Sequence, residues 1–383
     1  MARAVLSATV RRMTSVRVSA GGARYPIHIA EGALARAGRL ARAAGIAPGP
    51  CAIVTDARVA RLYGRKLRRA LASAGFRVAV FVAVPPGERS KTVARTEALY
   101  AAFARAGLER GRPVFALGGG VVGDLAGFAA ATWLRGVPLV MVPTSLLAQV
   151  DSSVGGKVGV DLPAGKNLVG AFHQPRVVVI DPAVLDTLPA RHVRAGLAEA
   201  AKVGFALDRP LVALLERHAA TLRAGGPRAR RALSQVIARA VKAKARVVSS
   251  DERDQGRRQL LNYGHTVAHA LESLGGYRTW IHGEAVALGM AVAARIAVRQ
   301  ELLSLRVADR QARLLRALGL PRPERALAGV SARKLLRAMR LDKKRISGEQ
   351  RFVLTEGVGI ASFGHRVSRA EVIAALQDAG CAP

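Results

Sequence analysis

The alternation of apolar strands with helical stretches in the first half of the chain constrains the fold more than any other feature. Between the apolar runs lie stretches whose apolar residues recur at helical spacing, such as residues 60–75 and 92–107. Strands that alternate with helices form a parallel sheet with helices on both faces. The pattern therefore predicts an α/β domain over residues 14–183, with strands at 51–55, 76–84, 113–119, 137–143 and 176–181.

The pattern of residues changes after Asp181-Pro182. Strand-like runs almost disappear, and long stretches rich in Ala, Leu and Arg take over, interrupted by one β-like piece at 351–359. We predict a domain boundary near residue 183 and a mostly α-helical domain over residues 184–383. Two domains suit a chain of 383 residues, because a single core rarely serves more than about 250–300 residues. We interpret residues 1–13, which bear Arg and no acid, as an N-terminal extension.

The charge balance is strongly basic, with 60 Lys and Arg against 26 Asp and Glu and a formal net charge of +34. Such a charge attracts anions in general, nucleic acids included. The basic residues are scattered through helical stretches rather than gathered in one tract, so we expect solvated helix faces and no nucleic-acid partner. No run of 18 apolar residues is free of charge, so we expect no membrane partner and a cytoplasmic protein. Two cysteines exclude a disulfide scaffold.

A glycine-rich turn, Leu117–Asp124, follows the third predicted strand and opens a helical stretch. Glycines let backbone amides approach a phosphate, and a helix N-terminus favours negative charge. Asp56 ends the first strand, where a carboxylate can bind ribose hydroxyls, and residues 86–91 bring an acid and a base to the end of the second. Open α/β sheets bind ligands at these strand ends, so the pattern favours a nucleotide site.

A polar segment over residues 144–173 carries two of the ten lysines of the chain, Lys157 and Lys166, among glycines. Lysine is a mobile point charge that suits a phosphate or a carboxylate. The density of small residues favours close approach of the backbone to a ligand over a merely solvated loop.

A second cluster has the residue types of a metal site. His265 and His269 share one helix face at i,i+4 spacing, His282 opens the next helical run, and Glu199 lies in an earlier one. Three N or O ligands with an open fourth position are typical of catalytic zinc. Spacing alone nominates His265 and His269 together, and it does not tell a ligand from an acid–base residue. The stretch lacks the glutamate of the HExxH motif, which argues against a metalloprotease.

Longer strings of the sequence resemble the 3-dehydroquinate synthase family over nearly the whole chain, from about residue 14. They are GGGVVGDLAGFAAATWLRGV (118–137), PTSLLAQVDSSVGGKVGVDLPAGKNLVGAFHQP (143–175), GLAEAAKVG (196–204), RRQLLNYGHTVAHALE (257–272), IHGEAVALGM (281–290) and LDKK (341–344). The resemblance implies an NAD-binding α/β domain and a helical domain that flank one active site. It also implies conversion of 3-deoxy-D-arabino-heptulosonate 7-phosphate (DAHP) to 3-dehydroquinate and phosphate, in the shikimate pathway, with catalytic NAD and a divalent metal, Zn or Co.

The resemblance further implies a role for each matching residue. Glu199, His265 and His282 become the metal ligands, and His269 becomes a substrate and proton-transfer residue. Arg135 is expected to reach the phosphate in the neighbouring subunit, which implies a homodimer. The other expected substrate residues are Asp151, Lys157, Asn167, Lys202, Lys244, Arg258, Asn262 and Lys344. The expected NAD contacts are Asp56, Gly87, Glu88, Lys91, Gly119, Gly120, Val121, Gly123, Asp124, Thr144, Ser145, Lys157, Lys166 and Thr187.

The sequence departs from the family pattern at Arg58, where Asn is usual, and at Pro86, where Asp is usual. Two enzymatic alternatives share the fold: another sugar-phosphate cyclase that makes a valiolone or an inosose, and a metal-dependent polyol or glycerol-phosphate dehydrogenase. A substrate assay distinguishes the first alternative from a 3-dehydroquinate synthase. Stoichiometric release of NADH would identify the second alternative.

Overall fold

A seven-stranded sheet organises the first half of the protein, as a computed structural model shows; it describes residues 13–339, 345–346 and 349–383. All neighbouring strands run parallel except β1 and β2, which form an antiparallel hairpin at one edge. The order across the sheet is β1 (Thr14–Ala20), β2 (Ala23–Ile29), β9 (Val177–Ile180), β6 (Leu139–Pro143), β5 (Val114–Gly118), β3 (Pro50–Asp56) and β4 (Arg77–Val84).

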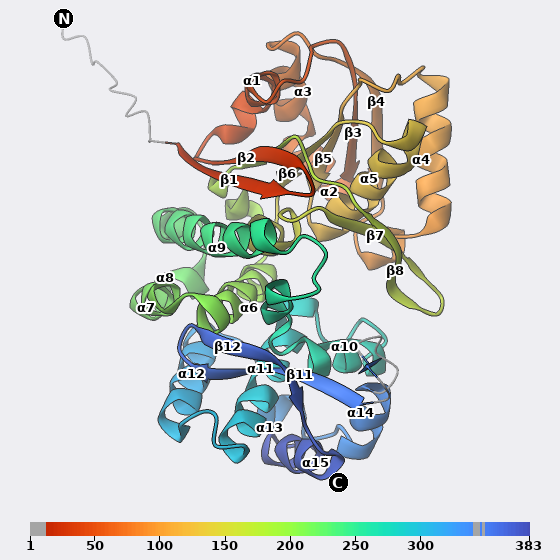
Figure 1. Cartoon of the computed structure of the whole chain (residues 1–383). Helices are drawn as coiled ribbons and strands as arrows, with labels where there is room; N and C mark the ends of the chain where they lie inside the picture. Colours follow the sequence, from red (N-terminus) through yellow and green to blue (C-terminus); the bar gives the residue numbers. More distant parts are fainter. Residues whose placement is uncertain (1–12, 340–344, 347–348) are drawn as a thin grey trace, which may run out of the picture.

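Helices cover both faces of this sheet (Figure 1). Alternate residues of β5 point to opposite faces: Phe115 packs in a cluster with α1 (Ala37–Ala43) and α3 (Arg65–Ala72). Val114 packs in a cluster with α4 (Val93–Arg105) and α5 (Gly120–Thr132). Burial on both faces explains why these strands read as continuous apolar runs. The predicted α/β fold with a helical second half is confirmed.

Helices dominate the second half, which lies below the sheet in Figure 1. Between the helix that ends at Met339 and the helix that begins at Arg369, the chain forms a small antiparallel sheet of β10 (Arg345–Ile346), β11 (Glu349–Gly357) and β12 (Ile360–Arg366). The helices are α6 (Ala190–Leu207), α7 (Arg209–Arg217), α8 (Ala219–Ala224), α9 (Arg230–Ser250), α10 (His265–Leu274), α11 (His282–Arg299), α12 (Leu305–Ala317), α13 (Pro323–Ala326), α14 (Ala332–Met339) and α15 (Arg369–Asp378).

The sequence pattern missed two hairpins, β1–β2 and the pair β7 (Lys157–Leu162) and β8 (Gly165–Phe172), and it missed β12. These strands are rich in polar residues and glycine, and each is stabilised by its partner strand rather than by its own apolar run. One hydrophobic cluster continues from the sheet into the helical half, joining Leu125 and Val178 to Leu197 and Val203. A boundary near residue 183 falls in the connection between β9 and α6 and stays a prediction.

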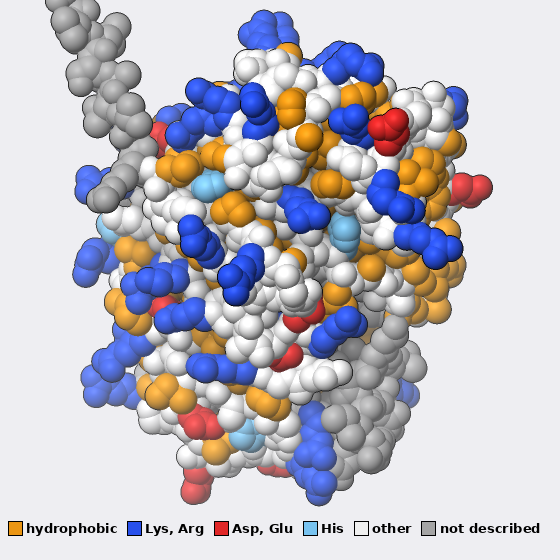
Figure 2. Space-filling view, turned by 45° about the horizontal axis from the view of Figure 1, so that its top comes forward, with side chains coloured by type: hydrophobic (Ala, Val, Ile, Leu, Met, Phe, Trp, Pro, Cys, Tyr) orange, Lys and Arg blue, Asp and Glu red, His pale blue; other side chains and the backbone are white. Residues whose placement is uncertain are grey.

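Basic side chains are spread over the face shown in Figure 2, between apolar and neutral ones. None of the helices in the described part of the chain has the length and hydropathy needed to cross a membrane.

Candidate active site

The carboxyl ends of three adjacent strands bring the predicted nucleotide residues together. Thr55 of β3 lies opposite Leu117 of β5, and Gly118 lies opposite Pro143 of β6. Asp56, the glycine turn and Thr144 therefore follow neighbouring strands at the same edge. The order in which the chain adds strands to the sheet changes at β3, because β4 lies on one side of β3 and β5 on the other. Open α/β sheets bind ligands at such a switch point.

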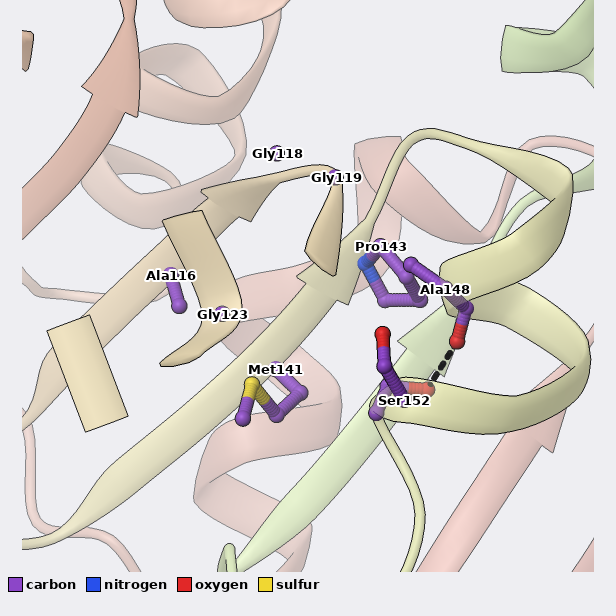
Figure 3. Close-up of a pocket in the computed structure, with 9 residues that line it drawn as sticks. Ala116, Gly118, Gly119, Gly123, Met141, Pro143, Ala148 and Ser152 are labelled. Atoms are coloured by element: carbon purple, nitrogen blue, oxygen red, sulfur yellow. Dashed lines mark hydrogen bonds between the residues drawn. The ribbon is translucent and has the colours of Figure 1, made fainter. Parts of the chain in front are cut away.

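The glycine turn leads directly into the N-terminus of α5 and borders a small cavity (Figure 3). At Gly118 a Cβ would lie 2.5 Å from the Val122 side chain, so packing within the chain requires glycine there. At Gly119 the nearest atom to such a Cβ is Ser145 Oγ at 3.4 Å, which is ordinary contact. Internal packing does not explain this second glycine, whereas close approach of a phosphate to the backbone does.

A buried ammonium group ties the end of the second strand to the glycine turn. Lys91 Nζ lies 2.7 Å from Asp124 Oδ2 in the first turns of α5 and 3.7 Å from Glu88 Oε1. It also donates to Asn167 Oδ1 on β8. Asn167, which the resemblance assigns to the substrate, thus lies beside residues assigned to NAD. Burial lowers the pKa of Lys91, but the charges of Asp124 and Glu88 outweigh it and raise the pKa overall.

Three other predicted NAD residues have local roles in the fold. Asp56 Oδ1 caps α2 (Ala57–Val59), accepting from the amides of Arg58 and Val59 at 2.9 Å each. Ser145 Oγ accepts from the amide of Ala148, and Thr187 Oγ1 lies 2.7 Å from the hydroxyl of Tyr63. These contacts within the protein explain the presence of the three side chains even if none of them binds a ligand. Their roles in NAD binding therefore stay predictions.

Three helices bring the predicted metal ligands together. Glu199 comes from α6, His265 begins α10 and His282 begins α11, and one ligand atom from each lies within 4.8 Å of the others. Glu199 Oε1 is 3.3 Å from His282 Nε2 and 3.8 Å from His265 Nε2. His269 lies outside this group, one turn along α10, with its ring centroid 5.4 Å from that of His265.

Glycines allow the three helices to approach so closely. A Cβ at Gly283 would lie 2.1 Å from the carbonyl oxygen of Ala195 on α6. A Cβ at Gly289 would lie 2.0 Å from the carbonyl oxygen of Gly264, directly before His265. No side chain fits at either position, so α11 contacts the backbone of α6 and of the turn before α10. This contact places His282 beside Glu199 and His265.

The surroundings of the three side chains suit a cation. Glu199 is fully buried, and neither of its carboxylate oxygens accepts a hydrogen bond of regular geometry within the described residues. Lys202 Nζ lies 2.5 Å from Glu199 Oε2. Burial lowers the pKa of His282, but its contacts with Glu199 and Glu272 outweigh burial and raise the pKa to about 10. A Glu-His-His donor set with this charge fits a catalytic divalent metal.

The sequence analysis did not single out Glu272, although its place on α10 was readable. It lies seven residues after His265, on the same helix face. Glu272 Oε2 is 3.3 Å from His282 Nδ1, and Glu272 Oε1 accepts from Lys166 Nζ at 3.2 Å. A carboxylate behind a ligating imidazole is a regular feature of metal sites.

Asp151 joins two predicted substrate lysines beside the metal group. Lys244 Nζ donates to Asp151 Oδ1 and to its carbonyl oxygen, and Lys202 Nζ lies 3.5 Å from Asp151 Oδ2. Burial raises the pKa of Asp151, but the two lysines outweigh it and hold the pKa well below its usual range. Burial lowers the pKa of Lys244 to about 8 despite Asp151. Asp151 and Glu199 together face the two ammonium groups, so the lysines have positive charge to spare for an anionic ligand only when Glu199 is engaged by a metal.

Arg258 and Lys157 lie close to this cluster. Arg258 is buried and donates to the carbonyl oxygens of Gly155 and Glu252 at 3.0 and 2.6 Å. Neutral carbonyls leave its charge available to an anion. Lys157 is exposed and pairs with Asp254 Oδ2 at 2.5 Å.

Three predicted substrate residues remain. Asn262 is half-buried at the end of a 3-10 turn over Arg257–Asn262, three residues before His265. Arg135 is exposed in a strained turn: Leu134 and Arg135 have φ of 49° and 66°, which L residues rarely adopt. Lys344 lies outside the described residues.

Comparison with known proteins identifies the family. Residues 81–195 match the model of the 3-dehydroquinate synthase N-terminal family, and residues 196–345 match that of the C-terminal family. The chain belongs to the 3-dehydroquinate synthase family. A 3-dehydroquinate synthase of Synechococcus sp. (strain CC9605) is 45% identical over 96% of this chain and 98% of the relative. One of Symbiobacterium thermophilum is 48% identical over 87% of this chain and 92% of the relative.

A solved structure of a related cyclase agrees with this membership. ValA, a 2-epi-5-epi-valiolone synthase of Streptomyces hygroscopicus subsp. jinggangensis 5008 with NAD+ and Zn2+ bound, is 31% identical. It aligns with a TM-score of 0.82 over 93% of this chain and 96% of its own. The alternatives of a valiolone or inosose cyclase and of a polyol dehydrogenase are not favoured, because the curated relatives at about 45% identity are 3-dehydroquinate synthases.

Proposed function

We propose that this member of the 3-dehydroquinate synthase family converts DAHP to 3-dehydroquinate and inorganic phosphate, with NAD and a divalent metal, Zn or Co. One observation carries the proposal: a continuous chain of contacts joins the glycine turn to the metal group. It runs from Asp124 to Lys91 (2.7 Å), Glu88 (3.7 Å), Lys166 (3.3 Å), Glu272 (3.2 Å) and His282 (3.3 Å). These contacts join the residues expected to hold NAD to the residues expected to hold the metal.

Glu199, His265 and His282 would hold the metal, which when bound acts as a Lewis acid and lowers the pKa of substrate hydroxyls. The turn at Gly119 and the N-terminus of α5 would hold the NAD pyrophosphate. The chemistry that NAD would supply when bound is reversible hydride transfer, so the reaction has no net oxidation. Atoms balance, because DAHP has the composition of 3-dehydroquinate plus phosphoric acid.

The remaining polar residues would bind and orient the substrate. With Glu199 engaged by the metal, Lys202, Lys244 and Arg258 would present more positive charge than Asp151 neutralises, which suits a substrate with a carboxylate and a phosphate. His269, one turn beyond a metal ligand and half-buried, would exchange a proton with the substrate or with the leaving phosphate.

We further propose a homodimer in which Arg135 completes the phosphate site of the partner. The strained turn at Leu134–Arg135 supports this, because backbone strain of about 1–3 kcal/mol per residue tends to persist where a function needs it. If Arg135 acts across the interface, R135A and H269A are each inactive alone but complement one another. In a random mixture, half of the dimers are mixed and each has one intact site, so about a quarter of wild-type activity returns. No recovery would mean that Arg135 acts within its own subunit or not at all.

The experiment that tests the main proposal is phosphate release from DAHP in the presence of NAD and Zn2+. We expect turnover that stops with a chelator and no accumulation of NADH. Sedoheptulose 7-phosphate and glucose 6-phosphate serve as matched substrates. Turnover of either in place of DAHP would identify a different cyclase, and NADH in proportion to product would identify a dehydrogenase.

A further inference from the structure

Glu272 is a buried carboxylate to which the proposed function assigns no contact with NAD, metal or substrate. Glu272 is 4% exposed, and each of its carboxylate oxygens contacts a side chain from another part of the chain. Oε2 faces Nδ1 of His282, and the opposite ring nitrogen of that histidine faces Glu199. The imidazole of His282 is thus held between two carboxylates, one of which lies outside the metal group.

The other oxygen of Glu272 binds the β7–β8 hairpin, which belongs to the sheet half of the protein. Lys166, on β8, reaches Glu272 Oε1 at 3.2 Å across 106 positions of sequence. Its ammonium group also lies 3.3 Å from Glu88 Oε1 and 4.4 Å from the ring centroid of Tyr277. Figure 1 shows this hairpin extending from the sheet half toward α10. Lys166 therefore fastens the hairpin to the helix that carries His265.

We propose that Glu272 is a positioning residue that couples metal binding at His282 to closure of the β7–β8 hairpin through Lys166. This inference rests on the proposed metal site. It adds a residue that touches neither metal nor substrate, and it makes the hairpin a segment whose position depends on metal occupancy.

The physical argument is one of orientation. Glu272 fixes the ring plane of His282 by accepting from Nδ1, and this leaves Nε2 aimed at the group formed with Glu199 and His265. Loss of such a carboxylate typically costs about 10–100-fold in metal affinity. In return, a fixed His282 ring holds the carboxylate with Oε1 toward Lys166. Coupling free energies are reciprocal. If the metal favours the closed hairpin, the protein with its hairpin closed binds the metal more tightly.

The first measurement is the Zn2+ dissociation constant of the full-length protein without NAD or substrate, by competition with a coloured chelator. We expect E272Q, which keeps the shape and removes the charge, to bind Zn2+ about 10–100-fold more weakly than wild type. The control is E109Q, whose glutamate is 74% exposed and ion-paired with Arg112, and which should bind Zn2+ as wild type does. Circular dichroism shows whether each variant is folded.

The second measurement is hydrogen exchange of residues 157–172 with and without saturating Zn2+. We expect Zn2+ to slow exchange of the hairpin in wild type and in E109Q, but not in E272Q or K166M. K166M leaves the ring of His282 in place. Because the coupling is reciprocal, K166M can weaken Zn2+ binding only by the part of the affinity that comes from the hairpin. The change in the Zn2+ dissociation constant therefore cannot exceed the factor by which Zn2+ slows exchange of the hairpin in wild type.

The outcomes separate this inference from the proposed function. Wild-type affinity in folded E272Q would overturn the positioning role. Zn2+-dependent protection that persists in either E272Q or K166M, or that is missing in a wild-type protein that binds Zn2+, would overturn the coupling. Failure of the wild-type protein to bind Zn2+ at all would instead overturn the metal site and the proposed function with it.

Discussion

Replacement of Gly283 by alanine tests whether close helix approach sets the geometry of the metal site. The new Cβ would lie 2.1 Å from the carbonyl oxygen of Ala195, whereas real Cβ contacts are no shorter than 3.0 Å. The start of α11 and the backbone of α6 at Ala195, which is four residues before Glu199, must therefore move apart by at least 0.9 Å, the difference between these two distances. His282 is the residue directly before Gly283. Metal–ligand distances tolerate about 0.2 Å, so the displacement is several times too large for ligation.

Gly38 of α1 provides a matched control for the packing cost. A Cβ at Gly38 would lie 2.5 Å from the carbonyl oxygen of Ala70, on the face of the sheet remote from the metal group. Both substitutions overpack a helix against backbone, which costs about 1–3 kcal/mol and exceeds the roughly 1 kcal/mol that alanine gains over glycine in a helix.

The assays are thermal unfolding and the Zn2+ dissociation constant. We expect G38A and G283A to lower the melting temperature alike, and only G283A to weaken Zn2+ binding, by more than about tenfold. A misplaced ligand costs at least as much metal affinity as the loss of a group that hydrogen-bonds to a ligand. If G283A binds Zn2+ as tightly as G38A, the contact of α11 with α6 does not determine the ligand geometry and the reasoning fails.

Three further predictions concern the site. H265A should lose bound metal and activity, while H269A should lose activity and keep the metal; metal analysis of the purified variants checks this, and the reverse result would exchange the two roles. Because burial lowers the pKa of Lys244 to about 8, its cation is present below that pH and lost above it. We expect kcat/KM for DAHP to fall as the pH rises through about 8, and K244R, which stays charged, to flatten that part of the profile; a fall unchanged in K244R would assign it elsewhere. Finally, a net charge of +34 should draw in the anionic substrate, so kcat/KM should fall as salt shortens the Debye length from about 30 Å at 0.01 M to about 8 Å at 0.15 M. Equal values at both salt concentrations would show that the charge has no part in capture.

From the sequence alone we predicted the fold class, which the structure confirms, and a nucleotide site at the carboxyl ends of the strands, which stays a prediction. Strands β3, β5, β6 and β9 are buried along nearly their whole length, and β4 is an apolar strand at the edge of the sheet, so all five were visible as apolar runs without a structure. The order of strands and helices places their carboxyl ends at one edge. The hairpins β1–β2 and β7–β8 were not visible, because their stability comes from pairing and their composition is polar.

The spacing of residues along the chain did not identify which side chains meet. Helical spacing favours His265 with His269, whereas the family resemblance implied Glu199, His265 and His282, and the structure brings these three together from three helices. The physical reason is that a three-helix site depends on how closely the helices approach, and this is set by glycines such as Gly283 against the backbone of a distant helix. The contact between Glu272 and Lys166 has the same origin, since it joins two segments that are 106 residues apart and belong to different halves of the fold.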